Sequence, residues 1–258
     1  VDLDGDGEVG GPNDAFGFGF FPGQFGMAVL SQHRIVEHKV RTFQDFLWAD
    51  MPNSLLPTDF YGAEAQEVFR LSSKSHWDVP IRIGQREVHF LVSHPTPTVF
   101  DDPVIDQNGR RNHDEIRFWA DYIRPWNGRY IYDDDGNHGG LRPGAMFVLA
   151  GDQNADPFDG DSVPGAIDQL LGDVLVNTRV TPASPGAVEQ AGLQGGDNDI
   201  HVGDPSFDTA DFSDSPPGNL RVDYVLPRRN LRIVDAGGYW PLADDPAFAP
   251  VGVFDPDT

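Results

Sequence analysis

The sequence predicts one α/β domain, because short apolar strands alternate with helical segments and no linker separates two halves. Two patterns carry this prediction. A continuous apolar run at 146–150 ends in a glycine, as in a buried central strand, and an apolar stripe at 112–123 has the spacing of a helix. Apolar residues make up 39% of the 258 residues and aromatic residues 11%, which is sufficient for a core. The predicted domain spans 1–258.

The expected elements follow in chain order from hydrophobic periodicity and turn residues. Helices are expected at 112–123 and 167–171, and a short helix or strand at 63–69. Asn112 with Glu115 matches a helix-capping pattern, and Gly84-Gln85 is suited to a hairpin turn. The Gly-, Pro- and Asp-rich insert at 181–219 is expected to be a long loop, solvated or shaping the substrate entrance. Strands are expected at 27–30, 35–42, 79–83, 88–93, 146–150, 222–226 and 231–234.

The chain is strongly acidic, with 18 Lys and Arg residues against 41 Asp and Glu residues and a formal net charge of −23. This charge excludes a broad basic surface for nucleic acid and a polybasic membrane anchor. No apolar run approaches the ~18 residues of a membrane-spanning helix. The chain has no cysteine, so disulfides give no direct information on its compartment. Its abundance of Asp, Gly and Pro, with Lys39 and Lys74 as its two lysines, is typical of exported or salt-adapted bacterial proteins.

The first 25 residues form an acidic loop rich in Gly, Asp and Phe. Residues 2–9 place carboxylates at positions one, three and five and glycine at position six, which is the pattern of a calcium-binding loop. Asn13 stands at position twelve, where such a loop has a bidentate Glu, and no helical pattern flanks the segment. A solvated acidic loop is therefore the alternative. The carboxylates of the candidate calcium site are Asp2, Asp4, Asp6 and Glu8.

Polar residues follow the buried strand at 146–150, in the segment Gly151-Asp152-Gln153-Asn154. Asp152 and Asn154 are two residues apart, so at a strand end both side chains point to the same side. They are suited to binding a water molecule or a phosphate oxygen. A polar turn, in which Asp and Asn bond the backbone, is the structural alternative.

Two further strands carry residues suited to catalysis. His94 follows the strand at 88–93, where it could act as a general acid or donate a hydrogen bond to a developing negative charge, although structural histidines are common. Asp223 lies within the apolar strand at 222–226, where a carboxylate is costly unless it is paired or functional. Arg221 is its neighbour in sequence but points to the opposite face of a strand.

Taken together and in their order along the chain, these motifs resemble the endonuclease/exonuclease/phosphatase superfamily, which has the deoxyribonuclease-I-like fold. The resemblance is closest to large secreted bacterial members described as hydrolase-like. It implies a two-sheet β-sandwich flanked by helices, a four-layer α/β fold. The segments that carry it are 26–31, 72–80, 93–97, 110–117, 151–154 and 221–225.

The resemblance implies a metal-dependent phosphoesterase, in which Mg²⁺ or Ca²⁺, with Mn²⁺ as an alternative, binds the scissile phosphate. Asp152 and Asn154 would bind the metal, and Asp152 would also orient or deprotonate the attacking water. His94 would donate a hydrogen bond to a phosphate oxygen, and Asp223 would orient a histidine further along the chain. Three more residues are expected near the site, namely His76, Arg111 and His113.

The sequence departs from the family pattern at both ends. The Asn and the metal-binding Glu of the family's first strands have no match before residue 26, and no Ser-Asp-His run follows residue 225. We therefore expect a fragment with little or no phosphoesterase activity in isolation.

The expected substrate is a small phosphoester rather than nucleic acid, bound by a secreted or periplasmic monomer that does not insert into membranes. One alternative is a non-catalytic calcium-binding extracellular module that keeps the fold. The other is a carboxylic-ester hydrolase, against which the absence of a Gly-x-Ser-x-Gly motif counts.

Overall fold

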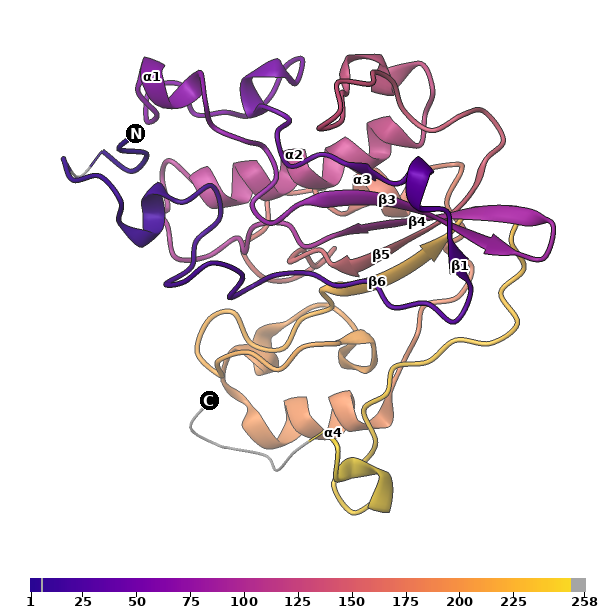
Figure 1. Cartoon of the computed structure of the whole chain (residues 1–258). Coiled ribbons are helices and arrows are strands. Elements are labelled where there is room, and N and C mark those ends of the chain that lie inside the picture. The colour runs from indigo at the N-terminus through magenta and orange to yellow at the C-terminus, as the bar shows by residue number, and fades with distance from the viewer. Residues whose placement is uncertain (6, 252–258) are drawn as a thin grey trace.

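The centre of the molecule is one mixed β-sheet (Figure 1). The computed structural model describes residues 1–5 and 7–251, and the strand order within them is β1-β3-β4-β5-β6, with β2 pairing with β3. Strands β4 and β5 are parallel, whereas the other pairs are antiparallel. The strands are β1 (Arg34–Ile35), β2 (Arg41–Thr42), β3 (His76–Ile83), β4 (Arg86–Ser93), β5 (Met146–Asp152) and β6 (Asp223–Pro227).

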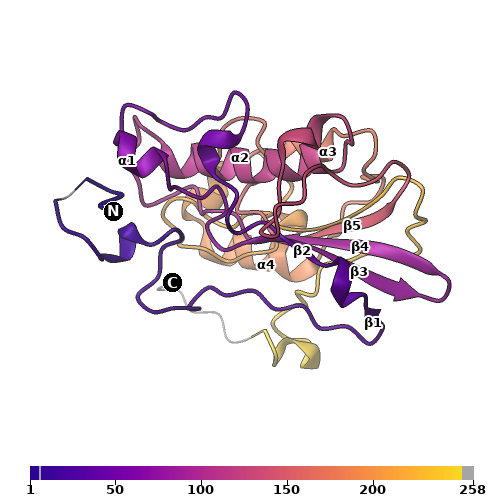
Figure 2. The same cartoon turned by 45° about the horizontal axis from the view of Figure 1, so that its top comes forward.

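The helices lie mainly on one face of the sheet, which the long helix α2 covers (Figures 1 and 2). In the part of the chain that the structure describes, no helix is long and apolar enough to cross a membrane. The helices are α1 (Ala63–Gln66), α2 (Gln107–Tyr122), α3 (Asp168–Leu171) and α4 (Pro185–Gln194).

The core forms where α2 packs on the sheet. Trp119 and Phe118 of the helix are fully buried and make edge-to-face ring contacts with Phe43. Leu91 of β4 and Leu149 of β5 face the same interior, as the two-residue alternation of a strand requires. This packing fixes the height of α2 above the strands.

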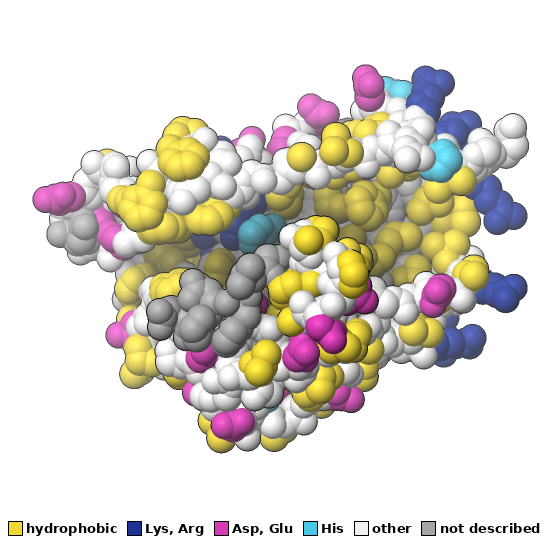
Figure 3. Space-filling view, turned by 90° about the horizontal axis from the view of Figure 1, so that it is seen from below, with side chains coloured by type: hydrophobic (Ala, Val, Ile, Leu, Met, Phe, Trp, Pro, Cys, Tyr) yellow, Lys and Arg dark blue, Asp and Glu magenta, His cyan; other side chains and the backbone are white. Residues whose placement is uncertain are grey.

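The opposite face of the sheet is also apolar. Figure 3 shows hydrophobic side chains gathered beneath the sheet, beside the lobe that carries α4. Val225 of β6 is 67% exposed there, whereas its neighbour Tyr224, which points toward α2, is 3% exposed.

The α/β class is confirmed, but the described residues form one sheet, and the two-sheet sandwich is not seen among them. The segments 27–30 and 231–234, which we expected to be strands, lack the pairing that a second sheet would need.

The sequence predicted most other elements close to their observed bounds. The hairpin of β3 and β4 turns at Gly84, which has a φ of 60°. The segment 35–42 divides into β1 and β2, because a 3₁₀ turn at Glu37–Lys39 interrupts the extended chain. The largest difference is in the insert 181–219, where we expected a loop and α4 forms. Ser184 caps this helix through the Ala187 N–H, and Pro185 takes its first position.

Candidate active site

The sheet topology gathers polar residues from four strands at one edge. Because β4 and β5 are parallel, their carboxyl ends meet there, and the antiparallel β3 and β6 begin there. We call this group the edge site. It consists of Lys74, His94, Asp152, Asn154 and Asp223.

The carbonyl oxygen of Pro95 connects three of the loops at the edge site. Asn154 Nδ2 donates a hydrogen bond to it at 3.0 Å, and Lys74 Nζ donates another at 3.2 Å. Asn154 N–H in turn donates to Asp152 Oδ1 at 2.8 Å. The Asn154 amide is thereby oriented with its Nδ2 group toward Pro95. Its Oδ1 remains available as an acceptor or a metal ligand.

Backbone conformations that few residues adopt shape the turn after β5. Gly151 has a φ of 139°, and a Cβ atom there would lie 2.1 Å from the carbonyl oxygen of Ser93. Asn154 has a φ of 47°, in the left-handed region that asparagine tolerates better than most residues. The sequence Gly-Asp-Gln-Asn therefore suits this turn for steric as well as chemical reasons.

His94 and Asp152 face each other across the two parallel strands. His94 Nε2 lies 3.6 Å from Asp152 Oδ2, which is too long for a direct hydrogen bond. Burial, and then the Lys74 ammonium, lower the pKa of His94 to about 4, so its imidazole is neutral at pH 7. Burial is also the largest cause that raises the pKa of Asp152 to about 6, and Asp223 adds to the effect.

Asp223 lies opposite Asp152 in the β5–β6 register, so the two carboxylates share one face of the sheet. Its backbone N–H donates to Thr209 Oγ1 at 2.9 Å, which ties β6 to the insert 181–219. Partial burial raises the pKa of the Asp223 carboxyl. A cation bound beside Asp152 and Asp223 would oppose both effects and favour the ionised carboxylates.

Two buried residues of α2 hold the loops of the edge site in place. Glu115 accepts hydrogen bonds from Ser73 N–H, at 2.7 Å, and from Thr96 N–H, at 2.6 Å. Asn112 Nδ2 donates to the carbonyl oxygens of Thr96 and Gln153, both at 2.8 Å. We expected Asn112 to cap the helix, but α2 begins at Gln107 and Asn112 lies within it. The sequence signal that could have identified Glu115 and Asn112 was the position of these polar residues on the apolar side of the helical pattern.

Lys74 is the residue of the edge site that the motif analysis did not select. Its ammonium makes no ion pair within 4 Å among residues 1–5 and 7–251, although Asp152 and Glu115 both act on its charge. Burial is the largest effect and lowers the pKa of the ammonium group. The sequence signal that could have identified Lys74 was the rarity of lysine, because the chain has two lysines and one of them lies in the Ser-Ser-Lys-Ser-His segment.

The structure gives His76, Arg111 and His113 roles away from the edge site. His76 is fully buried; its Nδ1 accepts from Ser72 Oγ and its Nε2–H donates to the carbonyl oxygen of Glu115. Arg111 donates to the carbonyl oxygens of Leu71, Arg70 and Phe16. His113 contacts its neighbour Asp114 at 3.0 Å. His76 and Arg111 therefore support the loops, whereas no hydrogen bond of the His113 ring leads to the edge site.

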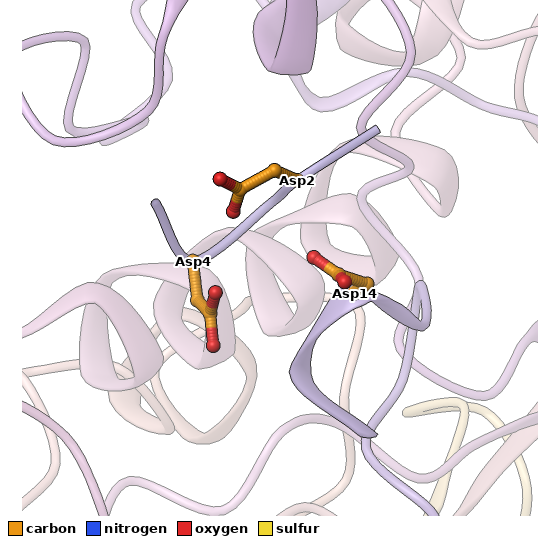
Figure 4. A group of neighbouring side chains, drawn as sticks. All are labelled: Asp2, Asp4 and Asp14. Atoms are coloured by element: carbon orange, nitrogen blue, oxygen red, sulfur yellow. The ribbon is translucent and has the colours of Figure 1, made fainter. Parts of the chain in front are cut away.

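A second group of carboxylates lies in the N-terminal loop (Figure 4). Asp2, Asp4 and Asp14 bring one oxygen each within 4.8 Å of the others. Asp14 therefore joins two of the four residues that we expected. Asp6 lies outside the described residues, and Glu8 is not part of this group. The calcium site stays a prediction.

The donor set of the edge site fits a hard divalent cation. Asp152 offers Oδ2 and Asn154 offers Oδ1, and carboxylate and amide oxygens are the ligands that Mg²⁺ and Ca²⁺ prefer. Mg²⁺ is commonly bound by one or two carboxylates together with water and substrate phosphate, and Asp152 and Asn154 are the residues that would hold it here.

The sheet thus presents carboxylate, amide and imidazole groups together at one strand edge. The chain belongs to the Endonuclease/Exonuclease/phosphatase family, whose model matches residues 2–250, and the resemblance noted in the sequence is thereby confirmed. No curated protein matches the chain.

Solved structures with low identity are similar to the chain. Sphingomyelinase C from Streptomyces griseocarneus is 17% identical with a TM-score of 0.42, over 79% of this chain and 53% of that protein. A beta toxin mutant from Staphylococcus aureus with bound magnesium ions is 11% identical with a TM-score of 0.35, over 62% of this chain and 44% of the toxin. The chain therefore matches about half the length of these proteins.

Proposed function

We propose that the edge site hydrolyses a phosphodiester with the help of a divalent metal ion. The observation that carries the proposal is the convergence of Asp152, Asn154 and His94 on one edge, through the parallel pairing of β4 and β5. Family membership supports the same reaction class. The expectation of a small phosphoester in an exported protein belongs to this proposal.

Each residue has a role that its surroundings support. A metal ion held by Asp152 and Asn154 would supply Lewis-acid stabilisation of the phosphate. Asp152 Oδ2 faces the open side and can orient or accept a proton from the attacking water. With a pKa of about 4, His94 is neutral and acts as a hydrogen-bond donor to a phosphate oxygen rather than as a cationic acid. Asp223 contributes negative charge beside Asp152.

The test measures metal binding and turnover in the same samples. Calorimetry with Mg²⁺ and Mn²⁺ should detect binding that Asp152→Asn abolishes. Hydrolysis of bis(4-nitrophenyl) phosphate should depend on the metal and fall about 10³-fold in the same variant. Turnover is expected to be slow, so the assay uses a high concentration of the protein. Asp59→Asn, which alters an exposed carboxylate outside the site, is the control. Equal loss in both variants, or turnover that does not depend on metal, would contradict the proposal.

The geometry of the N-terminal loop keeps the calcium-binding module as a second candidate. Asp2, Asp4 and Asp14 converge without any contribution from the edge site. Calcium binding that Asp4→Asn removes and Asp152→Asn leaves intact, with no turnover in any form, would favour the module over the enzyme. No feature of the described residues favours a carboxylic-ester hydrolase.

A further inference from the structure

A cavity of about 680 Å³ lies between the N-terminal loop and the turn that precedes β3. Its loop side is formed by Ala15–Met27, and its other side includes the segment Ser72–Ser75 and Trp77. The charged residues in its lining are Arg70, Lys74 and Asp134, which sum to +1 in a chain of net charge −23. The charged side chains that line the cavity are therefore not predominantly acidic, unlike those of the chain as a whole.

The loop side of the cavity is aromatic and uncharged. Residues 15–32 contain no Asp, Glu, Lys or Arg, although these types make up 23% of the chain. Four of the phenylalanines of the loop stay exposed, to between 44% and 74% of their surface. Exposed aromatic groups gathered at one cavity are typical of a ligand-binding region. The four are Phe18, Phe20, Phe21 and Phe25.

The base of the loop is fixed in place. The guanidinium of Arg111 donates to the carbonyl oxygen of Phe16, and that of Arg70 lies 4.4 Å from the Phe16 ring centre. A Cβ atom on Gly17 would lie 1.8 Å from the carbonyl oxygen of Ser73, so only glycine permits this approach. The aromatic residues beyond Gly17 are consequently held over the Ser72–Ser75 segment.

Lys74 belongs to both the cavity and the edge site. It lines the cavity, and its Nζ shares the Pro95 carbonyl with Asn154 Nδ2. Arg70 pairs with Asp45 at 2.6 Å, and Asp134 accepts from Thr42 Oγ1 at 2.5 Å, so these two charges are already engaged. Of the three charged residues of the lining, Lys74 is the one without an oppositely charged or side-chain hydrogen-bonding partner among the described residues.

We propose that this cavity binds the apolar organic group of a phosphodiester, while Lys74 binds its phosphate and directs it toward Asp152 and Asn154. The proposal deepens the proposed function and rests on it for the reaction. The substrate class is a monomeric phosphodiester with an aryl or alkyl group large enough to fill the aromatic cavity. Lys74 is the phosphate-binding cation.

The test is binding without turnover, measured by calorimetry in the absence of added metal. Diphenyl phosphate and dimethyl phosphate carry the same charge and differ in apolar surface. We expect diphenyl phosphate to bind at least about tenfold more tightly, because its rings leave water. Lys74→Met should weaken its binding about tenfold, and Lys74→Arg should restore most of it. Phe21→Ala should weaken it about threefold and should not affect dimethyl phosphate.

Matched controls separate the site from general effects. Lys39→Met removes the other lysine, which pairs with Glu87 and does not line the cavity. Phe158→Ala removes a phenylalanine that is 66% exposed, close to the 61% of Phe21. Equal affinity for the two phosphates, no detectable binding of diphenyl phosphate, or equal effects of the control variants would overturn the proposal. Absence of metal-dependent turnover by the unmodified protein in the earlier assay, with diphenyl phosphate still bound, would overturn the proposed function alone.

Discussion

His89 within β4 and His94 directly after it each face an aspartate, and the two pairs differ in distance and in exposure. His89 Nδ1 lies 2.8 Å from Asp78 Oδ1, with side-chain exposures of 13% and 2%. His94 Nε2 lies 3.6 Å from Asp152 Oδ2, with side-chain exposures of 29% and 31%. The first pair lies inside the sheet and the second at its edge.

The two pairs consist of the same residue types and differ in how completely their hydrogen-bonding groups are satisfied. Asp78 also accepts a hydrogen bond from Tyr122 OH at 2.7 Å, and Arg41 donates to the same hydroxyl. This closed network satisfies the buried groups and stabilises the fold. The Asp152 carboxylate, by contrast, has an oxygen without a direct partner at hydrogen-bond distance among the described residues, and this oxygen is available to a water molecule or a metal ion.

Breaking the His89–Asp78 pair should give the largest effect on stability. Asp78→Asn should lower the free energy of unfolding by about 3 kcal/mol, because it leaves His89 and Tyr122 with a weaker buried partner. Urea unfolding followed by tryptophan fluorescence measures the change. A loss below about 1 kcal/mol, the size expected for an exposed pair, would remove the distinction between the two pairs.

The affinity for a metal ion should depend on pH through Asp152 of the His94–Asp152 pair. Because the pKa of Asp152 is raised to about 6, its carboxyl binds a proton below that pH and then competes with the metal. The apparent affinity for Mn²⁺ should therefore fall about tenfold per pH unit below pH 6 and level off above it. Calorimetry between pH 5 and pH 8 checks this. Asp78→Asn should leave the profile unchanged, and a profile without a break near pH 6 would contradict the assignment.

Removing one hydroxyl from the closed network should have a smaller effect. Tyr122→Phe deletes the donor to Asp78 but keeps the ring that packs against Phe43 and Trp119. We expect a loss of about 1 kcal/mol in the free energy of unfolding, the usual contribution of one buried hydrogen bond. Tyr239→Phe, on an exposed tyrosine, is the matched control in the same urea titration. Similar losses in the two variants would show that burial of the hydroxyl is immaterial.

The smallest predicted effect on stability comes from a change in the His94–Asp152 pair. The folded pKa of Asp152 lies above the ordinary value of 3.8, so the ionised carboxylate is less favourable in the folded chain than in the unfolded one. Stability therefore decreases as the pH rises from about 4 to about 6, and the cost persists at pH 7. Asp152→Asn should leave the free energy of unfolding at pH 7 unchanged or raise it by up to about 1 kcal/mol. A clear loss in thermal melting would indicate a structural role.

Strand-end residues were predictable from the sequence because their chemistry and their periodicity coincide. Asp152, Asn154 and His94 each follow an apolar run, so the run predicts the strand and the polar residue predicts the site. Glu115 and Asn112 were not assigned their observed contacts, because a helical pattern shows which face is buried but not which loops lie beneath it. Helix α4 was missed because Gly and Pro dominate its neighbourhood, although Ser184-Pro185 is a good start signal.

The parallel pairing of β4 and β5 also has a consequence for how the protein folds. The two strands are joined by residues 94–145, a connection that contains α2. Their ends meet only after this long loop closes and the helix docks, and such nonlocal closure is slow compared with hairpin formation. The β3–β4 hairpin can form early, since its turn is short. The edge site should therefore be among the last features to assemble, and its integrity should report on completed folding of the whole domain.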